Sequence, residues 1–212
     1  MAQRGVRIAV ARRPRAARGE GERLRGEILR AAERLLIDKG AADAVSIRGV
    51  ATAVGVTPPS IYLHFADKDE LIFAVCQQQF ERLEELVDEA SVGIDDPLER
   101  LRKMGEAYVR FGVGHPEQYR ILLMSKGDVS IDDFTKGSMP GVTTFRKLMA
   151  AIEACMDAGI FRRQDVFLVA TGIWSLVHGI TSMRITLPEF PFAGEQRLLD
   201  HVFETYARGL AP

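Results

Sequence analysis

The sequence predicts an all-α protein with a small N-terminal unit of three helices and a larger C-terminal helical bundle. Apolar residues recur at three- and four-residue spacing along almost the whole chain, and the alternation that marks strands is nearly absent. With 47% hydrophobic and 27% charged residues among 212, the chain can bury a sizeable core. We expect a basic tail over residues 1–20, a small helical domain over 21–68 and a larger helical domain over 69–212.

The small domain is divided by residues that start and stop helices. Gly40 follows the first helix as a stop signal. Ser46 is placed to cap a short second helix that Gly55 ends. Thr57 is placed to cap a third helix with Pro58 at its first position, where a missing N–H costs nothing. The apolar stripe of the first helix consists of Ile28, Ala32, Leu35 and Leu36.

A long helix is expected to follow from Asp67, with Glu70 three residues later as in a capping box. Residues 126–140 contain two glycines and a proline and are expected to form a mobile connection with one helical turn. The apolar face of the long helix comprises Leu71, Val75, Leu83, Leu86 and Val87. Further helices are expected over residues 97–113, 116–125, 141–158, 164–187 and 195–209.

Cysteine content and hydropathy exclude several classes of protein. Cys76 and Cys155 are far apart, which argues against a disulfide framework or a zinc module and favours two buried apolar thiols. The longest apolar stretch, Val166 to Ile180, is shorter than a membrane span needs, so we expect a buried core helix and no membrane. No secretory apolar segment is found, so a cytoplasmic protein is expected, although an Arg-rich leader also resembles an organelle transit peptide.

The charge is distributed unevenly along the chain. Residues 1–65 contain twelve Lys and Arg against six Asp and Glu, whereas the remainder contains sixteen against twenty-three. A basic head on an acidic body suggests that only the head approaches a polyanion. The tail arginines Arg12, Arg13, Arg15 and Arg18 could follow phosphates or enter a minor groove, and a solvated tail has the same composition.

The spacing of Ala51, Gly55 and Ile61 is that of a helix-turn-helix. Such a motif needs a small residue where its helices meet and a branched apolar residue on the second helix. In the turn it needs a residue that tolerates positive φ, and glycine does so because it has no Cβ. Two packed core helices would show similar spacing, so the residues that follow are needed to decide.

Those residues closely resemble the signature of the TetR family of transcription factors, over about residues 24–72. They are Tyr62, His64, Phe65, Lys68 and Leu71. One departure is the Pro58-Pro59-Ser60 run, which places base readout at Pro58 in doubt. The resemblance implies that the helix over 58–65 enters the major groove of operator DNA, with Ile61 and Phe65 in the core.

The chemistry of the exposed positions is compatible with that docking. Hydroxyl, imidazole and cationic groups can contact phosphates or base edges, and apolar groups can contact thymine methyls. Tyr62 and His64 are assigned to phosphates, although His64 is equally compatible with a packing role. The candidate DNA-binding residues are Arg48, Thr57, Pro59, Ser60, Tyr62, Leu63, His64 and Lys68.

The larger domain has the composition of a ligand sensor, because bulky apolar and aromatic residues recur on its helices. A core without a cavity would have the same pattern. The segments 115–120 and 174–179 resemble a TetR subgroup with a Trp…His-Gly motif, in which His178 is expected at a helix or dimer interface and not on a metal. The candidate ligand-binding residues are Met104, Tyr108, Phe111, Met124, Phe145, Met149, Trp174 and His178.

No catalytic motif is found, and no cofactor or metal ion is expected. The resemblance implies a homodimer that pairs residues 164–187 and 195–209, with a two-fold axis that presents two recognition helices to a palindrome. The hypothesis is a repressor released from DNA by a small, largely hydrophobic ligand. A regulator controlled by a protein partner, and a helical small-molecule-binding or enzymatic protein with a similar core, are the alternatives.

Overall fold

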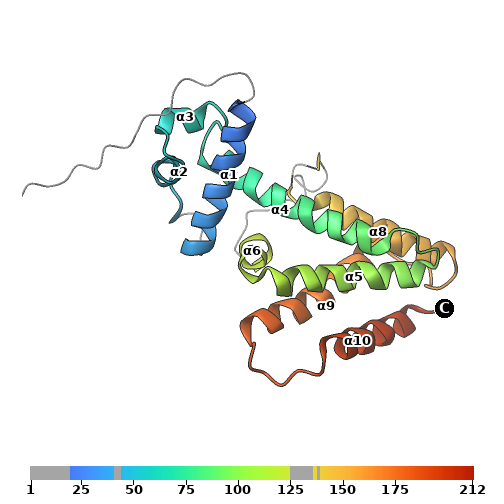
Figure 1. Cartoon of the computed structure of the whole chain (residues 1–212). Coiled ribbons are helices and arrows are strands. Elements are labelled where there is room, and N and C mark those ends of the chain that lie inside the picture. The colour runs from blue at the N-terminus through green and yellow to red at the C-terminus, as the bar shows by residue number, and fades with distance from the viewer. Residues whose placement is uncertain (1–19, 41–43, 125–135, 138) are drawn as a thin grey trace, which may run out of the picture. The chain divides into compact units, whose positions relative to one another are not determined.

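The computed structural model describes residues 20–40, 44–124, 136–137 and 139–212, and over these residues all regular secondary structure is helical, as predicted. The chain divides into two compact units, Met1–Val75 and Cys76–Pro212 (Figure 1). The first unit contains α1 (Glu20–Lys39), α2 (Ile47–Val54), α3 (Pro58–Tyr62) and the start of α4 (Lys68–Ser91). The second contains the rest of α4, α5 (Pro97–Gly114), α6 (Pro116–Tyr119), the π-helical segment Arg120–Met124, α8 (Val142–Asp157), α9 (Val166–Thr186) and α10 (Glu195–Leu210).

The core of the first unit is the predicted one. α1 packs against α2, and α2 packs against α3. The guanidinium of Arg25 lies 5.0 Å from the ring centroid of Phe65, so the charged end of α1 covers the edge of this core. Leu35 of the predicted stripe is half-buried. Fully buried are Ile28, Ala32, Leu36, Val50, Ala51, Ile61, Phe65 and Leu71.

The predicted turn between α2 and α3 is confirmed. Ser46 Oγ accepts the Gly49 N–H at 3.1 Å and caps α2. Gly55 has φ 77°, and its N–H donates to the Ala51 carbonyl at 3.0 Å, with Val56 donating to the same carbonyl. A Cβ on Gly55 would meet no atom within 4 Å, so the backbone conformation alone requires glycine there.

The start of α4 is also capped as predicted, with one difference in the donor. Asp67 Oδ1 accepts the Glu70 N–H at 2.8 Å, as the first half of a capping box. The Glu70 carboxylate accepts the N–H of Ala66 instead of that of Asp67. Both bonds satisfy backbone N–H groups at the start of α4.

The prediction that the Thr57 side chain caps α3 is wrong. The Thr57 hydroxyl makes no cap hydrogen bond and instead lies 3.1 Å from Ser60 Oγ. Pro58 and Pro59 lack N–H groups, and the first available donor, Ser60 N–H, is taken by the Thr57 carbonyl at 2.9 Å. The two prolines therefore remove the donors that a side-chain cap would need.

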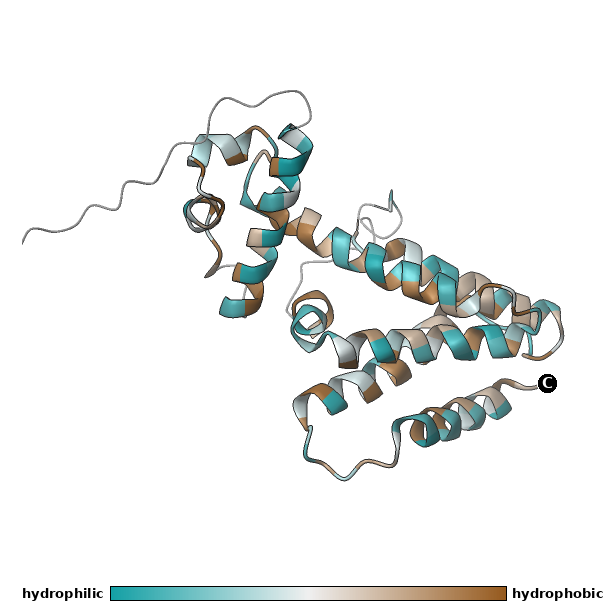
Figure 2. Ribbon diagram, viewed as in Figure 1, coloured by the Kyte–Doolittle hydropathy of each residue, from teal (hydrophilic) through white to brown (hydrophobic). Residues whose placement is uncertain are grey.

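The second unit is built around α5, which packs against both α8 and α9. Gly105 and Gly112 on α5 face Val177 and Thr181 on α9, and the missing side chains allow the two helices a close approach. Lys147 on α8 forms ion pairs with Glu84 and Asp88 of α4, within the same unit. Figure 2 shows hydrophilic residues on outward turns of α4 and α5, with apolar residues along the packed helices.

The helix predicted over 116–125 is helical but changes its hydrogen-bond register. α6 ends at Tyr119 and continues as a π-helical turn to Met124. Apolar periodicity does not reveal this change, because one extra residue in a single turn leaves the pattern almost unaltered. Most of the predicted connection over 126–140 lies outside the described residues, as do the tail arginines Arg12, Arg13, Arg15 and Arg18.

The prediction that residues 166–180 form a buried core helix is met on one face only. Val169, Ala170 and Ile173 are buried, whereas Phe167 is 51% and Leu168 is 67% exposed. By length and composition alone, Val166–Thr186 could cross a membrane, although only 28% of its most apolar window is buried in the chain. The unburied face is therefore a large apolar surface that the single chain leaves open.

The two cysteines are free thiols, and only Cys155 is buried as expected. Cys155 is fully buried, whereas Cys76 is half-buried. Burial raises the pKa of Cys76, and burial raises the pKa of Cys155 to about 11. Neither thiol is therefore an activated nucleophile.

Candidate functional site

The short helix α3 has an inner and an outer face. Ile61 and Phe65 are buried, at 0% and 2% exposure, and anchor the helix in the core. Tyr62 is 53% and Leu63 is 83% exposed on the opposite side. The exposed phenol of Tyr62, the last residue of α3, and the exposed isobutyl group of Leu63, its C-cap, form a surface suited to contact with a partner.

Polar groups accompany this surface. Thr57 is exposed and Ser60 is half-buried, and their paired hydroxyls retain further donor and acceptor capacity. Pro59 is exposed between them and offers only carbon to a partner. The start of α3 therefore presents hydroxyl and apolar groups side by side, and no charge.

Positive and titratable groups lie at the ends of the neighbouring helices. Arg48 is exposed on α2, and Lys68 is half-buried as the first residue of α4. His64 is half-buried, and its Cε1 lies 4.0 Å from the position that a Cβ on Gly21 would take. His64 therefore packs partly against the start of α1 and partly faces solvent.

In the second unit, four aromatic or imidazole side chains form a connected hydrogen-bonded cluster, which we call the aromatic cluster. Tyr108 Oη lies 3.0 Å from Tyr119 Oη, and Tyr119 Oη lies 2.7 Å from His178 Nδ1. Trp174 Nε1 donates to Tyr108 Oη at 3.1 Å. The cluster joins α5, α6 and α9, and it confirms that His178 bridges helices.

Burial keeps the members of this cluster neutral. Burial raises the pKa of Tyr108 far above its ordinary value and also raises the pKa of Tyr119. Burial lowers the pKa of His178, because a charged imidazole is poorly solvated there. The cluster is therefore an uncharged polar site within an apolar core.

Aromatic rings extend the cluster on one side. The ring centroid of Phe145 lies 5.9 Å from that of Trp174 and 5.7 Å from that of Phe167, in edge-to-face contacts. The ring centroid of Trp174 in turn lies 6.1 Å from that of His178. Tyr108, Phe145, Trp174 and His178, all candidate ligand residues, are thus brought together.

The remaining candidates lie elsewhere in the second unit. Phe111 is buried and stacks on His115, Met104 is buried in the core, and Met149 is half-buried. Met124 is 38% exposed at the end of the π-helical segment. Tyr119, which sequence reasoning missed as a ligand candidate, is fully buried, and its only signal was its place in the 115–120 segment.

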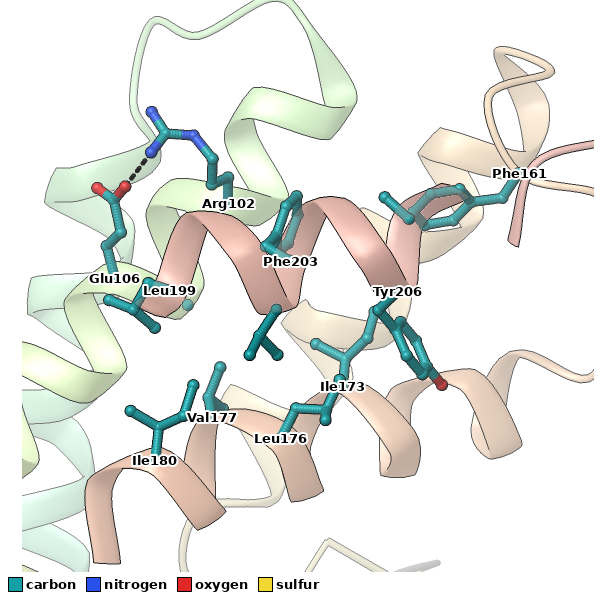
Figure 3. A pocket seen from close by; sticks show the side chains of 13 residues that line it. Arg102, Glu106, Phe161, Ile173, Leu176, Val177, Ile180, Leu199, Phe203 and Tyr206 are labelled. Carbon is teal, nitrogen blue, oxygen red and sulfur yellow. Dashed lines mark hydrogen bonds and ion pairs between the residues drawn. The ribbon is translucent and has the colours of Figure 1, made fainter. Parts of the chain in front are cut away.

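A separate pocket lies among α5, α9 and α10 (Figure 3). Arg102 and Glu106 stand at one end, and the other labelled side chains are apolar or aromatic. The lining is Arg102, Gly105, Glu106, Phe161, Ile173, Leu176, Val177, Ile180, Leu199, Val202, Phe203, Tyr206 and Ala207. None of the candidate ligand residues lines this pocket.

The charged side chains at that end of the pocket are paired with one another and with neighbouring polar groups. Glu106 is only 7% exposed, and it accepts from Lys103 Nζ and Gln196 Nε2, both at 2.9 Å, and pairs with Arg102. Arg102 also reaches Asp200 of α10 at 3.4 Å. Burial acts to raise the pKa of Glu106, but donation by Lys103 and Gln196 with the nearby positive charges outweighs it and lowers the pKa. The network therefore joins α5 to α10.

No group of three His, Cys, Asp or Glu side chains that could hold a metal ion occurs within the described ranges of the chain. The groups described above on α3, on its neighbours and in the aromatic cluster offer hydrogen bonds, apolar contact and charge for recognition.

Comparison with known proteins agrees with this division. Residues 28–75 match the bacterial regulatory proteins of the tetR family, and residues 101–206 match the tetracyclin repressor-like C-terminal domain. The HTH-type transcriptional activator FasR of Mycolicibacterium smegmatis is 32% identical over 152 residues, which span 69% of this chain and 64% of that protein. The second match covers half of the chain by itself.

Solved structures agree in fold. A regulatory protein in the tetR family from Rhodococcus RHA1 superposes with a TM-score of 0.68 at 20% identity, covering 89% of this chain and 97% of that one. The fatty acid degradation regulator FadR from Bacillus halodurans gives a TM-score of 0.64 at 14% identity, covering 88% and 93%. With a helix-turn-helix whose second helix is exposed, and with both halves matched, the chain belongs to the TetR family of DNA-binding transcription regulators.

Proposed function

We propose that the chain binds palindromic operator DNA as a homodimer, with α3 of each copy in the major groove. The observation that carries this proposal is the outer surface at the end of α3, where Tyr62 and the C-cap Leu63 are exposed while Ile61 and the following Phe65 are buried and hold the helix in place. Tyr62, His64, Arg48 and Lys68 would contact phosphates, which fix position. Thr57, Pro59, Ser60 and Leu63 would meet base edges and thymine methyls.

The dimer would form through residues 164–187 and 195–209. Phe167, Leu168 and Met183 of α9 are exposed in the single chain, and a partner copy would cover them. Ile173 and Leu199 of the same two segments are buried in the chain's own core and would contribute little to the interface. A two-fold pair would present its recognition helices to half-sites about 34–36 Å apart.

The ligand site would be the aromatic cluster, and the ligand a small and largely hydrophobic molecule. This site would lie in the predicted domain over 69–212. The Trp174-x-x-x-His178-Gly179 motif would place the chain in the subgroup with this type of sensor domain. The similar protein from Bacillus halodurans is a fatty acid degradation regulator, which is compatible with an apolar ligand. By reciprocity, a ligand that prefers the form with low DNA affinity must lower DNA affinity when bound.

Coupling would run through α4. Its first residue, Lys68, belongs to the DNA-binding domain proposed over 21–68, and its later turns belong to the second unit. There, Lys147 pairs with Glu84 and Asp88, so a displacement of α8 would be passed to α4. We propose repression with release by ligand in the cytoplasm. Because the FasR relative is named an activator, a reporter fused to the operator must show the sign.

The deciding experiment measures DNA affinity by fluorescence anisotropy, with duplexes from the DNA that flanks the gene for this chain. We expect Tyr62→Ala and Lys68→Ala to abolish operator binding without changing the helical content or the mass of the dimer. Lys39→Ala is the matched control, because Lys39 is exposed in the same unit at the end of α1. Each lost phosphate contact should also reduce the slope of log K against log salt by about one. Wild-type affinity in both variants would reject the docking.

A thermal-shift screen tests whether the sensor takes a small molecule at all. A ligand present at 100 times its Kd should stabilise the folded protein by about 2.7 kcal/mol. Absence of any stabiliser would favour the alternative in which a protein partner controls DNA binding. Absence of salt-dependent DNA binding would instead favour a helical protein of other function.

A further inference from the structure

His178 stands at the end of a hydrogen-bonded chain whose first member can only donate. The indole N–H of Trp174 has no lone pair to accept with, so Tyr108 Oη is the acceptor of their 3.1 Å contact. The Tyr108 hydroxyl proton is then available to Tyr119 Oη at 3.0 Å. The Tyr119 proton in turn is available to His178 Nδ1 at 2.7 Å.

Donation from Tyr119 to Nδ1 would fix the tautomer of the imidazole. A neutral imidazole that accepts at Nδ1 carries its proton on Nε2. Tyr108 Oη also lies 3.4 Å from Nδ1, so both tyrosines approach the same nitrogen. In this order of donation His178 would be an Nε2–H donor, oriented by residues of α5, α6 and its own helix.

Nε2 lies on the other side of the imidazole ring. Nε2 of His178 has no hydrogen-bond partner among the described residues, and it is not among their sealed and unsatisfied polar atoms. The side chain as a whole is half-buried. A ring nitrogen without a partner among the described residues, on a half-buried side chain, is suited to a hydrogen bond with another molecule.

The surroundings restrict the rest of that molecule. Trp174 and Phe145 flank His178 through ring contacts, and Phe167 continues the aromatic surface. The tyrosine hydroxyls point toward one another and toward the imidazole. They therefore orient His178, and the flanking aromatic rings offer only carbon beside it. A single donor among aromatic carbon favours one oxygen head on an apolar body.

We infer that His178 Nε2–H donates to a carbonyl or carboxylate oxygen at the head of an apolar ligand, with Tyr119, Tyr108 and Trp174 as positioning residues. This inference rests on the proposed sensor function and specifies which ligands the sensor takes. It predicts that an amphiphile without an acceptor at its head is rejected, even when its chain is the same.

The first test is the tautomer, read from long-range ¹H–¹⁵N spectra of the full chain with labelled histidine. The chain has four histidines, and His178→Gln identifies the signals of His178 by their loss. We expect the Nε2–H pattern alone in the wild type. In Tyr119→Phe, where residue 119 cannot donate, we expect signals of both tautomers. An Nδ1–H pattern in the wild type would reverse the 2.7 Å contact and overturn the inference.

The second test compares probes that share one chain, namely decanoate, methyl decanoate and decylammonium, by calorimetry below their micelle concentrations. Decanoate or the ester should bind and decylammonium should not, and the stronger of the first two shows whether the head is a carboxylate or a carbonyl. Equal binding of all three, or binding of none, would overturn the inference.

Variants then assign the contact to His178. One lost hydrogen bond should weaken binding about fivefold to tenfold in His178→Leu. His178→Gln, whose amide N–H can replace Nε2–H, should restore most of that loss. His115→Gln is the control, because His115 uses Nδ1 on the Phe111 carbonyl and is outside the chain of donors.

DNA affinity measured without any probe distinguishes a failure of the ligand chemistry from a failure of the proposed function. All these variants should retain it, because none lies in the first unit. If the tautomer and probe results hold while the protein fails to bind DNA, the proposed function fails and the ligand chemistry stands. Unchanged probe affinity in His178→Leu, with DNA binding intact, would overturn only the ligand chemistry.

Discussion

Gly112 on α5 and Thr181 on α9 approach so closely that a Cβ on Gly112 would lie 2.2 Å from Thr181 Cγ2. The same Cβ would lie 2.7 Å from Cδ2 of Tyr119, whose ring is fully buried. One absent methyl group therefore sets both the α5–α9 packing and the position of Tyr119 in the aromatic cluster.

We predict that Gly112→Ala destabilises the protein by about 1–3 kcal/mol, the usual cost of overpacking a core. The free energy of unfolding in urea measures this change. Gly114→Ala is the matched control in the same helix, because a Cβ there meets no atom within 4 Å, and alanine favours the helix. Equal stability of the two variants would show that the helices are less closely packed than described.

At Gly55 the constraint is conformational and not steric. Its φ of 77° costs a residue with a Cβ roughly 1–2 kcal/mol. We expect Gly55→Ala to lower the thermal stability of the first unit and weaken DNA binding, with Gly55→Asn closer to the wild type, because asparagine tolerates this region. If alanine and asparagine behave alike in circular-dichroism melts, the left-handed turn is not what requires glycine.

Stability should depend on pH through His178. Burial lowers its pKa in the folded chain, so the unfolded chain binds the proton first as the pH falls. The contribution is fully present above the unfolded pKa of about 6.5 and is lost as pH falls through that value toward the lower folded pKa. Tyr108 and Tyr119, the titratable groups that face His178, stay neutral here because their pKa values are raised.

The measurement is the difference in urea midpoint between about pH 7.5 and about pH 5.5, on either side of the unfolded pKa, in the wild type and in His178→Gln. The wild type should lose more stability on acidification than the variant, because glutamine does not titrate. Parallel losses in both proteins would assign the pH dependence to other groups.

Leu168 on α9 is 67% exposed and should be buried in the dimer. Leu168→Glu is expected to shift the mass in light scattering from two chains to one without loss of helical content, because a charge would have to be buried unpaired. Val92→Glu serves as control, since Val92 is 78% exposed in the turn after α4. Persistence of the dimer in Leu168→Glu would place the interface elsewhere.

The sequence predicts best what depends on neighbours along the chain. Caps at Ser46 and Asp67, the turn at Gly55 and the inner face of α3 follow from residues within one or two turns of each other, and the structure has them all. The side-chain cap predicted at Thr57 is absent for an equally local reason. The two prolines after Thr57 lack the backbone N–H groups to which its hydroxyl would have bonded.

Features that depend on packing between distant segments were less predictable. Tyr119 meets His178 only because α6 packs against α5, which itself packs against α9, and apolar periodicity carries no information about that approach. The π-helical turn after Tyr119 alters the direction of the following side chains by one residue, and Met124 comes out exposed. Which apolar face of α9 is covered by its own chain also depends on tertiary packing.

Trp174 is the only tryptophan in the chain, and its indole donates to Tyr108 inside the aromatic cluster. Emission from this protein under selective excitation of tryptophan therefore reports on that one location, with no dye and no engineered label. Events on α3 would leave the spectrum unchanged unless they reach the cluster. A change in tryptophan emission when operator DNA is added would therefore show that DNA binding alters the aromatic cluster.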